Sequence, residues 1–289
     1  MALEFRPLPK AIGAQVLGLD PHNMSAEDIT RFRDAFNRNS VLLIRDLPLD
    51  PAAHIELTRA LGEPDIHPIP TGRLEGYPEI LVPKPYGLQH SDNPDEIIGR
   101  IPWHADVTFT ATPPRAALLR AIEIPQQGGQ TGFIDSAAVY AALDEATKQR
   151  IHGVEIIHRM VHGQRMLGFD VDDEKAAEVS SKFPDVAQPL VLRDPATGTE
   201  SLNISPLFAD EVIGMDRAAG DALIRELTDF ATQDRFIYWH DWQPDDLIIW
   251  NNYRTLHSAA GHPQRYSRTM HRTTVKATEP VGRPLAQVA

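Results

Sequence analysis

A histidine and an aspartate two residues apart, His104 and Asp106, are the side chains in this sequence best placed to do chemistry. In an extended strand, side chains at positions i and i+2 point to the same side, so this imidazole and carboxylate can meet one ligand. The neighbouring Trp103, Val107 and Phe109 are residue types that favour strands. One imidazole and one carboxylate suit a first-row transition metal but leave its site incomplete. At least one more ligand must therefore come from elsewhere in the chain.

Further candidates lie near the end of the chain. A hydrophobic run at 247–250 leads through a turn to His257, and Arg268 and Arg272 follow on a predicted strand. The two arginines have the same parity, so both guanidinium groups should face one side of that strand. Neighbouring guanidiniums in a protein interior are costly without anionic partners, and the arginine fork suits carboxylates and sulfonates. This segment therefore predicts binding of a small anion.

The composition narrows the class of protein. The 289 residues include 28 basic and 40 acidic side chains, a formal net charge of −12. That balance argues against a nucleic-acid partner or an anionic membrane, so an anionic substrate must be met by a local basic pocket. The absence of cysteine excludes disulfides, thiolate nucleophiles, Fe–S clusters and cysteine zinc sites. Because the N-terminus lacks an apolar signal region and no apolar run approaches the length of a membrane span, we expect a cytoplasmic protein.

The pattern along the chain predicts many short strands with a few helices. Ser25 should cap one early helix and Asp50 a second, and a buried strand at 41–44 lies between them. A helical stretch capped by Ser136 should run to about residue 151, and another helix should cover about 216–232. Eight prolines between Pro64 and Pro102 indicate irregular structure, and we expect a lid loop at about 83–102. A jelly-roll barrel or sandwich is favoured over a doubly wound parallel sheet, since no glycine-rich phosphate turn is present.

A set of motifs in a fixed order runs through nearly the whole chain: Trp103–Phe109, Gly128–Thr131, Gly214–Met215, Asp246–Asn251, His257 and Met270–Arg272. In this set the sequence resembles the taurine dioxygenase and 2,4-dichlorophenoxyacetate dioxygenase family of Fe(II)- and 2-oxoglutarate-dependent oxygenases. The resemblance implies a mainly β fold with helical insertions and a double-stranded β-helix (jelly-roll, cupin-like) core. It implies a single oxygenase domain over residues 1–289, in which we expect the lid loop at about 83–102, a segment that does not match the family, and a helical insertion at about 136–183.

The resemblance also assigns roles to individual residues. By it, His104, Asp106 and His257 are the catalytic metal ligands, two imidazoles and one carboxylate that hold Fe(II) and leave positions open for 2-oxoglutarate and O2. Halogenating relatives lack the carboxylate, so Asp106 implies hydroxylation. Thr131 and Arg268 would bind the distal carboxylate of 2-oxoglutarate. Contacts with the substrate are implied for Arg272, His67, Phe109, Phe208 and Asn203, with Arg100 as a further candidate.

The implied reaction is hydroxylation of a small organic anion, a carboxylate or a sulfonate or sulfate, with release of succinate and CO2. Cleavage of a C–O, C–N or C–S bond follows where the hydroxylated carbon bears a heteroatom. Pro70 stands where taurine dioxygenase has a substrate-contacting tyrosine, which argues against taurine itself. Family members are often dimers or tetramers, so we expect a homo-oligomer. Two alternatives share the fold: a cupin-like metal-dependent isomerase or hydrolase without oxygen chemistry, and a non-catalytic binding protein.

Overall fold

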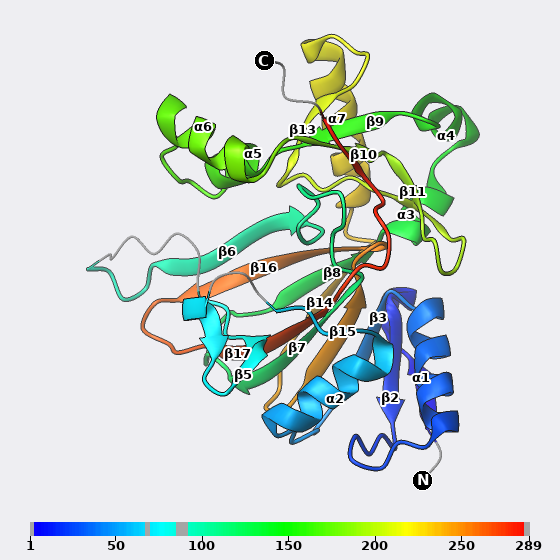
Figure 1. Ribbon diagram of the computed structural model, residues 1–289, viewed down its shortest axis with the longest axis vertical. Helices are drawn as coiled ribbons and strands as arrows, with labels where there is room; N and C mark the ends of the chain where they lie inside the picture. The colour runs from blue at the N-terminus through cyan, green and yellow to red at the C-terminus, as the bar shows by residue number, and fades with distance from the viewer. Residues whose placement is uncertain (1–2, 67–69, 85–91, 286–289) are drawn as a thin grey trace.

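Two β-sheets form the core of the computed structural model, which describes residues 3–66, 70–84 and 92–285 (Figure 1). The larger sheet contains, in spatial order, β1 (Glu4–Pro7), β2 (Gly13–Leu17), β3 (Val41–Ile44), β15 (Leu247–Asn251), β7 (Ala116–Glu123), β17 (Thr269–Val275), β5 (Tyr77–Leu81) and β4 (Arg73–Leu74). The smaller sheet contains β14 (Ile237–His240), β8 (Thr131–Asp135), β16 (Thr255–Pro263) and β6 (Ile97–His104).

The chain passes back and forth between these sheets. It runs from β5 in the larger sheet to β6 in the smaller one, then to β7 and β8, and later from β14 through β15 and β16 to β17. Every pairing among these strands is antiparallel. This alternation is a double-stranded β-helix, so the predicted mainly β fold with a jelly-roll core is confirmed.

Helices and short strands surround this core (Figure 1). The helices are α1 (Ala26–Arg38), α2 (Pro51–Leu61), α3 (Ser136–Ala142), α4 (Glu145–Ile151), α5 (Met160–Met166), α6 (Asp173–Lys182) and α7 (Arg217–Ala231), with 3-10 turns η1 (Pro9–Ala11) and η2 (Pro70–Gly72). The remaining strands are β9 (Glu155–His158), β10 (Val186–Pro189), β11 (Val191–Arg193), β12 (Glu200–Leu202), β13 (Ala209–Val212) and β18 (Arg283–Pro284). None of the helices in the described ranges is long and apolar enough to span a bilayer.

The first two helices begin where the sequence predicts. The Ser25 hydroxyl accepts the Asp28 N–H at 3.1 Å, and the Asp28 carboxylate accepts the Ser25 N–H at 3.1 Å, which completes a capping box. The Asp50 carboxylate accepts the Ala53 N–H at 2.8 Å, and Pro51 occupies the first turn of α2. Both helices turn apolar faces towards the larger sheet and cover its outer side.

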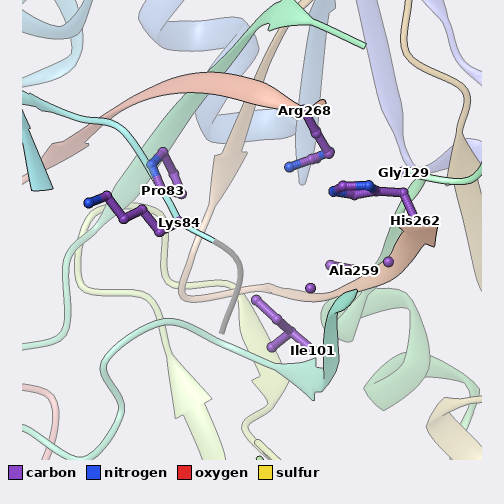
Figure 2. Close-up of a pocket in the computed structure, with 9 residues that line it drawn as sticks. Pro83, Lys84, Ile101, Gly129, Ala259, His262 and Arg268 are labelled. Carbon is purple, nitrogen blue, oxygen red and sulfur yellow. The ribbon is translucent and has the colours of Figure 1, made fainter. Parts of the chain in front are cut away.

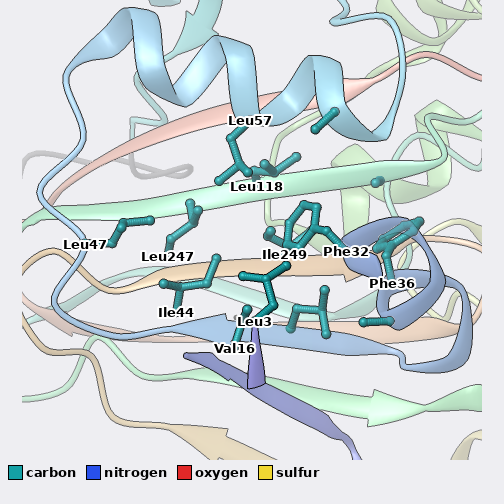
Figure 3. Packing of buried hydrophobic residues seen from close by; sticks show 14 of the residues in the cluster. Leu3, Val16, Phe32, Phe36, Ile44, Leu47, Leu57, Leu118, Leu247 and Ile249 are labelled. Carbon is teal, nitrogen blue, oxygen red and sulfur yellow. The ribbon is translucent and has the colours of Figure 1, made fainter. Parts of the chain in front are cut away.

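Strand β15 is buried on both faces, as its continuous apolar run predicts. Alternate side chains of a strand point to opposite faces. Leu247 and Ile249 therefore pack outward with side chains from α1 and α2 (Figure 3), while Ile248 and Trp250 join the cluster between the two sheets. Each fully buried side chain of this size stabilises the fold by about 1.5–3 kcal/mol. The strand thus fixes the positions of both neighbours, β3 and β7.

The predicted helix at 137–151 is wrong in its detail. It is two helices, because Leu143 is extended and the Asp144 carboxylate accepts the Thr147 N–H at 2.7 Å to start α4. The cap of α3 is Asp135, which accepts the Ala137 N–H at 2.9 Å, and Ser136 is the first helical residue. The predicted helical insertion at about 136–183 holds α3 to α6 and also strand β9.

The predicted lid loop at about 83–102 is shorter than expected. Residues 97–102 belong to β6, because their backbone pairs with β16, with Ile98 opposite His262 and Ile101 opposite Ala259. The sequence indicates a short strand near Ile97 and Ile98, but the strand continues through Gly99 and Pro102 to His104. Residues 85–91 of the predicted lid lie outside the described residues, so its role stays a prediction.

His158 is a buried histidine in the core of the helical region. Neither of its ring nitrogens has a hydrogen-bond partner among the described residues. Burial, with a smaller contribution from His162, lowers the pKa of His158 to about 3. A histidine in an unfolded chain titrates near 6.5. Between these values the unfolded state binds one more proton than the folded state, so stability falls as the pH falls from about 6.5 towards 3.

We therefore predict that His158→Leu flattens the pH dependence of stability. Near pH 5 the slope of the unfolding free energy against pH should decrease by about 1.4 kcal/mol per pH unit, the contribution of one proton. Urea unfolding between pH 4.5 and 8 measures this slope. His152→Leu, at an exposed histidine after α4, is the matched control. An unchanged slope in His158→Leu would contradict the assignment.

Candidate active site

Three side chains from distant parts of the chain converge at one end of the smaller sheet. His104 is the last residue of β6, Asp106 lies in the turn that follows, and His257 lies on β16 directly opposite His104. The Nε2 atoms of His104 and His257 lie 3.8 and 3.6 Å from Oδ1 of Asp106. The three donor atoms all lie within 4.8 Å of one another. The predicted trio is therefore brought together.

The reason for this convergence differs from the one that the sequence predicts. Strand β6 ends at His104, and Asp106 is in a turn whose next residue, Val107, has a φ of +56°. The interpretation of His104 and Asp106 as neighbours on one face of a continuous strand is wrong. A left-handed φ is rare for a β-branched residue, so surrounding groups must hold the turn in place.

Hydrogen bonding and burial set the protonation of the trio. Nδ1 of His104 lies 2.8 Å from the Pro102 carbonyl oxygen, which only accepts, so Nδ1 carries the hydrogen and the Nε2 lone pair is free. Burial lowers the pKa of His104 and holds that of His257 well below its usual range. Burial alone would raise the pKa of Asp106, but Arg272 and the two imidazoles outweigh it and lower that pKa.

These residues fit a divalent transition metal. Two neutral imidazoles and one ionised carboxylate are the donor set of non-haem Fe(II) oxygenases. The distances among the donor atoms exceed those of direct hydrogen bonds and suit a shared ion. Within the part of the chain that the structure describes, no other group of three His, Asp or Glu side chains has this geometry. The site can therefore hold Fe(II).

Arg272 lies beside this metal site and has N–H donors available for an anion. Its Nη2 donates to Oδ2 of Asp106 at 2.6 Å, and its guanidinium carbon lies 5.3 Å from the centre of the Trp250 ring. The Nε atom is buried, with no hydrogen-bond partner among residues 3–66, 70–84 and 92–285. A guanidinium group has five N–H donors, so Arg272 retains donors for an anionic ligand beside Asp106.

A second basic group, Arg268, lies on a small cavity of about 70 Å³. Arg268 and His262 lie on one side of this cavity and Pro83 and Lys84 on the other (Figure 2). Burial lowers the pKa of Arg268 to about 10, so it remains charged at neutral pH. Among the described residues no carboxylate forms an ion pair with Arg268. A partly buried cation without an ion-pair partner favours an anionic ligand in this cavity.

Thr131 lies on the strand next to this cavity. It pairs with Ala259, which also lines the cavity. The Thr131 hydroxyl oxygen accepts the Trp242 indole N–H at 3.0 Å. An indole N–H is only a donor, so the hydroxyl hydrogen of Thr131 remains available to an acceptor such as a carboxylate. The sequence did not single out Trp242, because nothing in the local pattern places it against Thr131.

Aromatic rings line the approach to the metal ligands. The Phe208 ring lies 6.4 Å from the His104 ring and 4.9 Å from Phe109, between ring centres. Phe183, which the sequence did not indicate, lies 5.4 Å from Phe109 in an edge-to-face contact. A Cβ at Gly163 would meet the Phe208 ring at 2.5 Å, so this glycine in α5 makes room for that ring. These contacts create an apolar, aromatic wall beside His104.

The other candidates lie elsewhere or outside the described residues. His67 is outside them. Asn203 donates its side-chain N–H to the Pro189 carbonyl at 2.9 Å, and within the described ranges its side chain does not hydrogen-bond to His104, Asp106 or His257. Arg100 is exposed on β6.

Comparisons with known proteins agree with this geometry. Residues 4–274 match the model of the family "Taurine catabolism dioxygenase TauD, TfdA family". The (S)-phenoxypropionate/alpha-ketoglutarate-dioxygenase of Sphingobium herbicidovorans is 31% identical over 277 residues, which cover 93% of each chain. The alpha-ketoglutarate-dependent 2,4-dichlorophenoxyacetate dioxygenase of a Burkholderia species is 28% identical, with 88% of this chain and 86% of that protein covered. A crystal structure of a taurine dioxygenase from Burkholderia xenovorans superposes with a TM-score of 0.80 at 26% identity, over 99% of this chain and 95% of that chain.

We predict that Asp106→Ala loses both metal binding and turnover. Loss of a partner in the outer shell of a metal site already costs about 10–100-fold in affinity, so loss of a direct ligand should weaken Mn(II) binding by more than about 100-fold. Calorimetric titration measures the affinity, and substrate-dependent succinate formation should also disappear. Asp173→Ala, at an exposed aspartate in α6, should leave both unchanged. Full turnover in Asp106→Ala would rule out the trio.

Proposed function

This chain belongs to the TauD/TfdA family of dioxygenases, and on that basis we propose that it hydroxylates a small organic anion that carries an aromatic or apolar group. As an enzyme of this family it depends on Fe(II), 2-oxoglutarate and O2. The substrate proposal rests on the pairing of a cation and an aromatic wall beside the metal site. Arg272 donates one N–H to Asp106 at 2.6 Å and has other N–H donors left, and the Phe208 ring lies beside the His104 ring.

We assign the metal ligands to His104, Asp106 and His257. Fe(II) held there couples the reduction of O2 and the decarboxylation of 2-oxoglutarate to hydroxylation of a substrate carbon, with succinate and CO2 as co-products. The chain contributes two neutral imidazoles, because burial keeps the pKa of each ring low. It also contributes an ionised Asp106, whose pKa is lowered. A carboxylate at this position supports hydroxylation rather than halogenation.

We propose that Arg268 and Thr131 bind the distal carboxylate of 2-oxoglutarate. Arg268 is a partly buried cation with no ion-pair partner among the described residues, and it lines a small cavity of about 70 Å³. Thr131 has a hydroxyl hydrogen to donate, because Trp242 already satisfies its oxygen. Together they offer a guanidinium group, which can form charge-assisted hydrogen bonds with a carboxylate, and a hydroxyl donor.

The substrate is proposed to lie between Arg272 and the aromatic wall. Arg272 would bind the anionic group, and Phe109 and Phe208, with Phe183, would contact the apolar part. Two relatives are named for phenoxypropionate and for 2,4-dichlorophenoxyacetate, both aromatic ethers of short carboxylic acids. Aryloxy carboxylates are therefore the favoured class. Contacts from His67 and Asn203 stay predictions.

In such a substrate the carbon between the ether oxygen and the carboxylate is the natural target. Hydroxylation there gives a hemiacetal, which collapses to a phenol and a 2-oxo acid with cleavage of the C–O bond. The carboxylate of the bound substrate would contact Arg272 and its aromatic ring would contact Phe208. The carbon between these two groups would then lie near the metal ligands. This arrangement explains why one anion-binding group and one apolar wall flank the same site.

Other readings are less well supported. An isomerase or hydrolase with the same metal ligands would have no use for Arg268 and Thr131, and a binding protein would not need the open metal positions. We further propose that residues 1–289 form one oxygenase domain, supported by the family match over residues 4–274. A cytoplasmic location and a homodimer or homotetramer stay predictions.

The substrate class is tested by succinate release. We expect aryloxyalkanoates to give the highest kcat/KM in a screen that also includes taurine, alkyl sulfates and N-substituted amino acids. Phe208→Ala should raise the KM for the aryloxy acid, because it removes the aromatic contact, and leave the KM for 2-oxoglutarate unchanged. Faster turnover of taurine or an alkyl sulfate, with none of any aryloxy acid, would contradict the proposal.

The cosubstrate site is tested with Arg268→Gln. A hydrogen bond to a charged group contributes about 1.5–3 kcal/mol, so the KM for 2-oxoglutarate should rise roughly 10- to 100-fold while the KM for the substrate changes little. Arg265→Gln, which removes a half-exposed arginine paired with Asp95, is the matched control. An unchanged KM for 2-oxoglutarate in Arg268→Gln would show that this cation does not bind it.

A further inference from the structure

The turn that carries Asp106 poses a structural problem. It leaves strand β6 at His104, and Val107 adopts a left-handed φ of +56°, which a β-branched side chain disfavours. The backbone groups of this turn no longer pair with β16, and buried N–H and C=O groups need partners. Side chains from three separate segments supply them. They are Asn252, Gln188 and Ser205.

Asn252 binds the peptide groups of Asp106 from both sides. Its Oδ1 accepts the Asp106 N–H at 2.7 Å, and its Nδ2 donates to the Asp106 carbonyl at 3.0 Å. The same Nδ2 donates to the Pro114 carbonyl at 2.9 Å, which ties the turn to the segment just before β7. Asn252 is 4% exposed and follows β15, so its backbone is fixed by the larger sheet. Water cannot readily replace these bonds.

Gln188 holds the second half of the turn. It lies on β10 and is fully buried, and its Nε2 donates to the carbonyls of Thr108 at 2.7 Å and Thr110 at 2.9 Å. The Ser205 hydroxyl accepts the Ala105 N–H at 3.1 Å at the beginning of the turn. The segments that hold residues 105–110 are therefore the turn after β15, strand β10 and the connection between β12 and β13.

We propose that Asn252 and Gln188 are positioning residues for the metal site. They hold the Asp106 turn in its unfavourable conformation, so the carboxylate faces both imidazoles in the metal-free protein and does not have to be ordered when the metal binds. This inference rests on the proposed role of Asp106 as a ligand. The outer partners of metal ligands usually bind side chains, whereas here they bind the backbone of the residue that supplies the carboxylate.

The sequence offers a closely matched control in the next residue. Asn251 is as buried as Asn252, and its amide contacts Asp194 at 3.3 Å and the Tyr253 N–H at 3.0 Å. Among the described residues, the Asn251 side chain forms no hydrogen bond with the Asp106 turn. Loss of either amide removes buried hydrogen bonds, but only loss of Asn252 should affect the metal ligand.

The test compares Asn252→Ala with Asn251→Ala in the 289-residue protein. Mn(II) affinity is measured by calorimetry, amide exchange of residues 105–110 by mass spectrometry without metal, and thermal stability by melting. Asn252→Ala should weaken Mn(II) binding about 10- to 100-fold and speed exchange of the Asp106 amide, as expected for loss of a metal-site support. Asn251→Ala should lower the melting temperature. Its Mn(II) affinity should stay within about two-fold of the wild-type value, because the support of the metal site is intact.

A second variant covers the case in which Asn252→Ala does not fold. Gln188→Met keeps the shape of the side chain but lacks the amide, and it should weaken Mn(II) binding about ten-fold and speed exchange at Thr108–Thr110. Wild-type affinity and exchange in the folded variants would overturn the inference. If the wild-type protein bound no Mn(II), the proposed function would fail, while exchange in the metal-free protein would still decide whether the amides hold the turn.

Discussion

The antiparallel pairing of β6 with β16 is the constraint on which the active site depends. Its register sets His104 opposite His257, two residues 153 positions apart in the chain, with ring centres 4.1 Å apart. A slip of one residue would turn one imidazole to the other face of the sheet. The register shift between His257 and Ala259 lies directly beside the ligand, where such irregularities often re-aim a side chain. The larger sheet and its helices hold this pairing from the other side of the core.

Burial converts this geometry into chemistry. The same desolvation that lowers the pKa of both imidazoles would raise the pKa of Asp106, were Arg272 and the imidazoles not beside it. Arg272 therefore has two tasks in the account, since it stabilises the ionised ligand and offers its remaining donors to the substrate anion. Arg268, at the cavity near Pro83, is proposed to bind a second anion. In a chain with a net charge of −12, these two partly buried guanidiniums create a local positive potential, as the proposed binding of two anions requires.

Local rules predicted the parts of the fold whose causes are local. The Ser25 capping box, the Asp50 cap and the buried strand at 247–250 depend on residues within a few positions of each other. The break between α3 and α4 is local too, because the Asp144 side chain caps the start of α4. The extent of β6 was missed because its hydrogen-bond partner lies about 160 residues away, and only tertiary pairing identifies it.

The candidate site divides in the same way. The identities of the metal ligands and of Arg268 and Arg272 followed from residue types and from the family resemblance. The causes of their positions did not, because the Val107 turn and its partners Asn252 and Gln188 are joined only in three dimensions. Phe183 was missed for a similar reason, since it reaches Phe109 from the end of a polar helix.

A crystal structure of the protein with Mn(II) and 2-oxoglutarate, grown without oxygen, tests the central claim most directly. The account predicts one metal ion bound by Nε2 of His104, a carboxylate oxygen of Asp106 and Nε2 of His257, with the distal carboxylate of 2-oxoglutarate on Arg268 and Thr131. A metal ion bound without His257, or a cosubstrate carboxylate that lies away from Arg268, would contradict it.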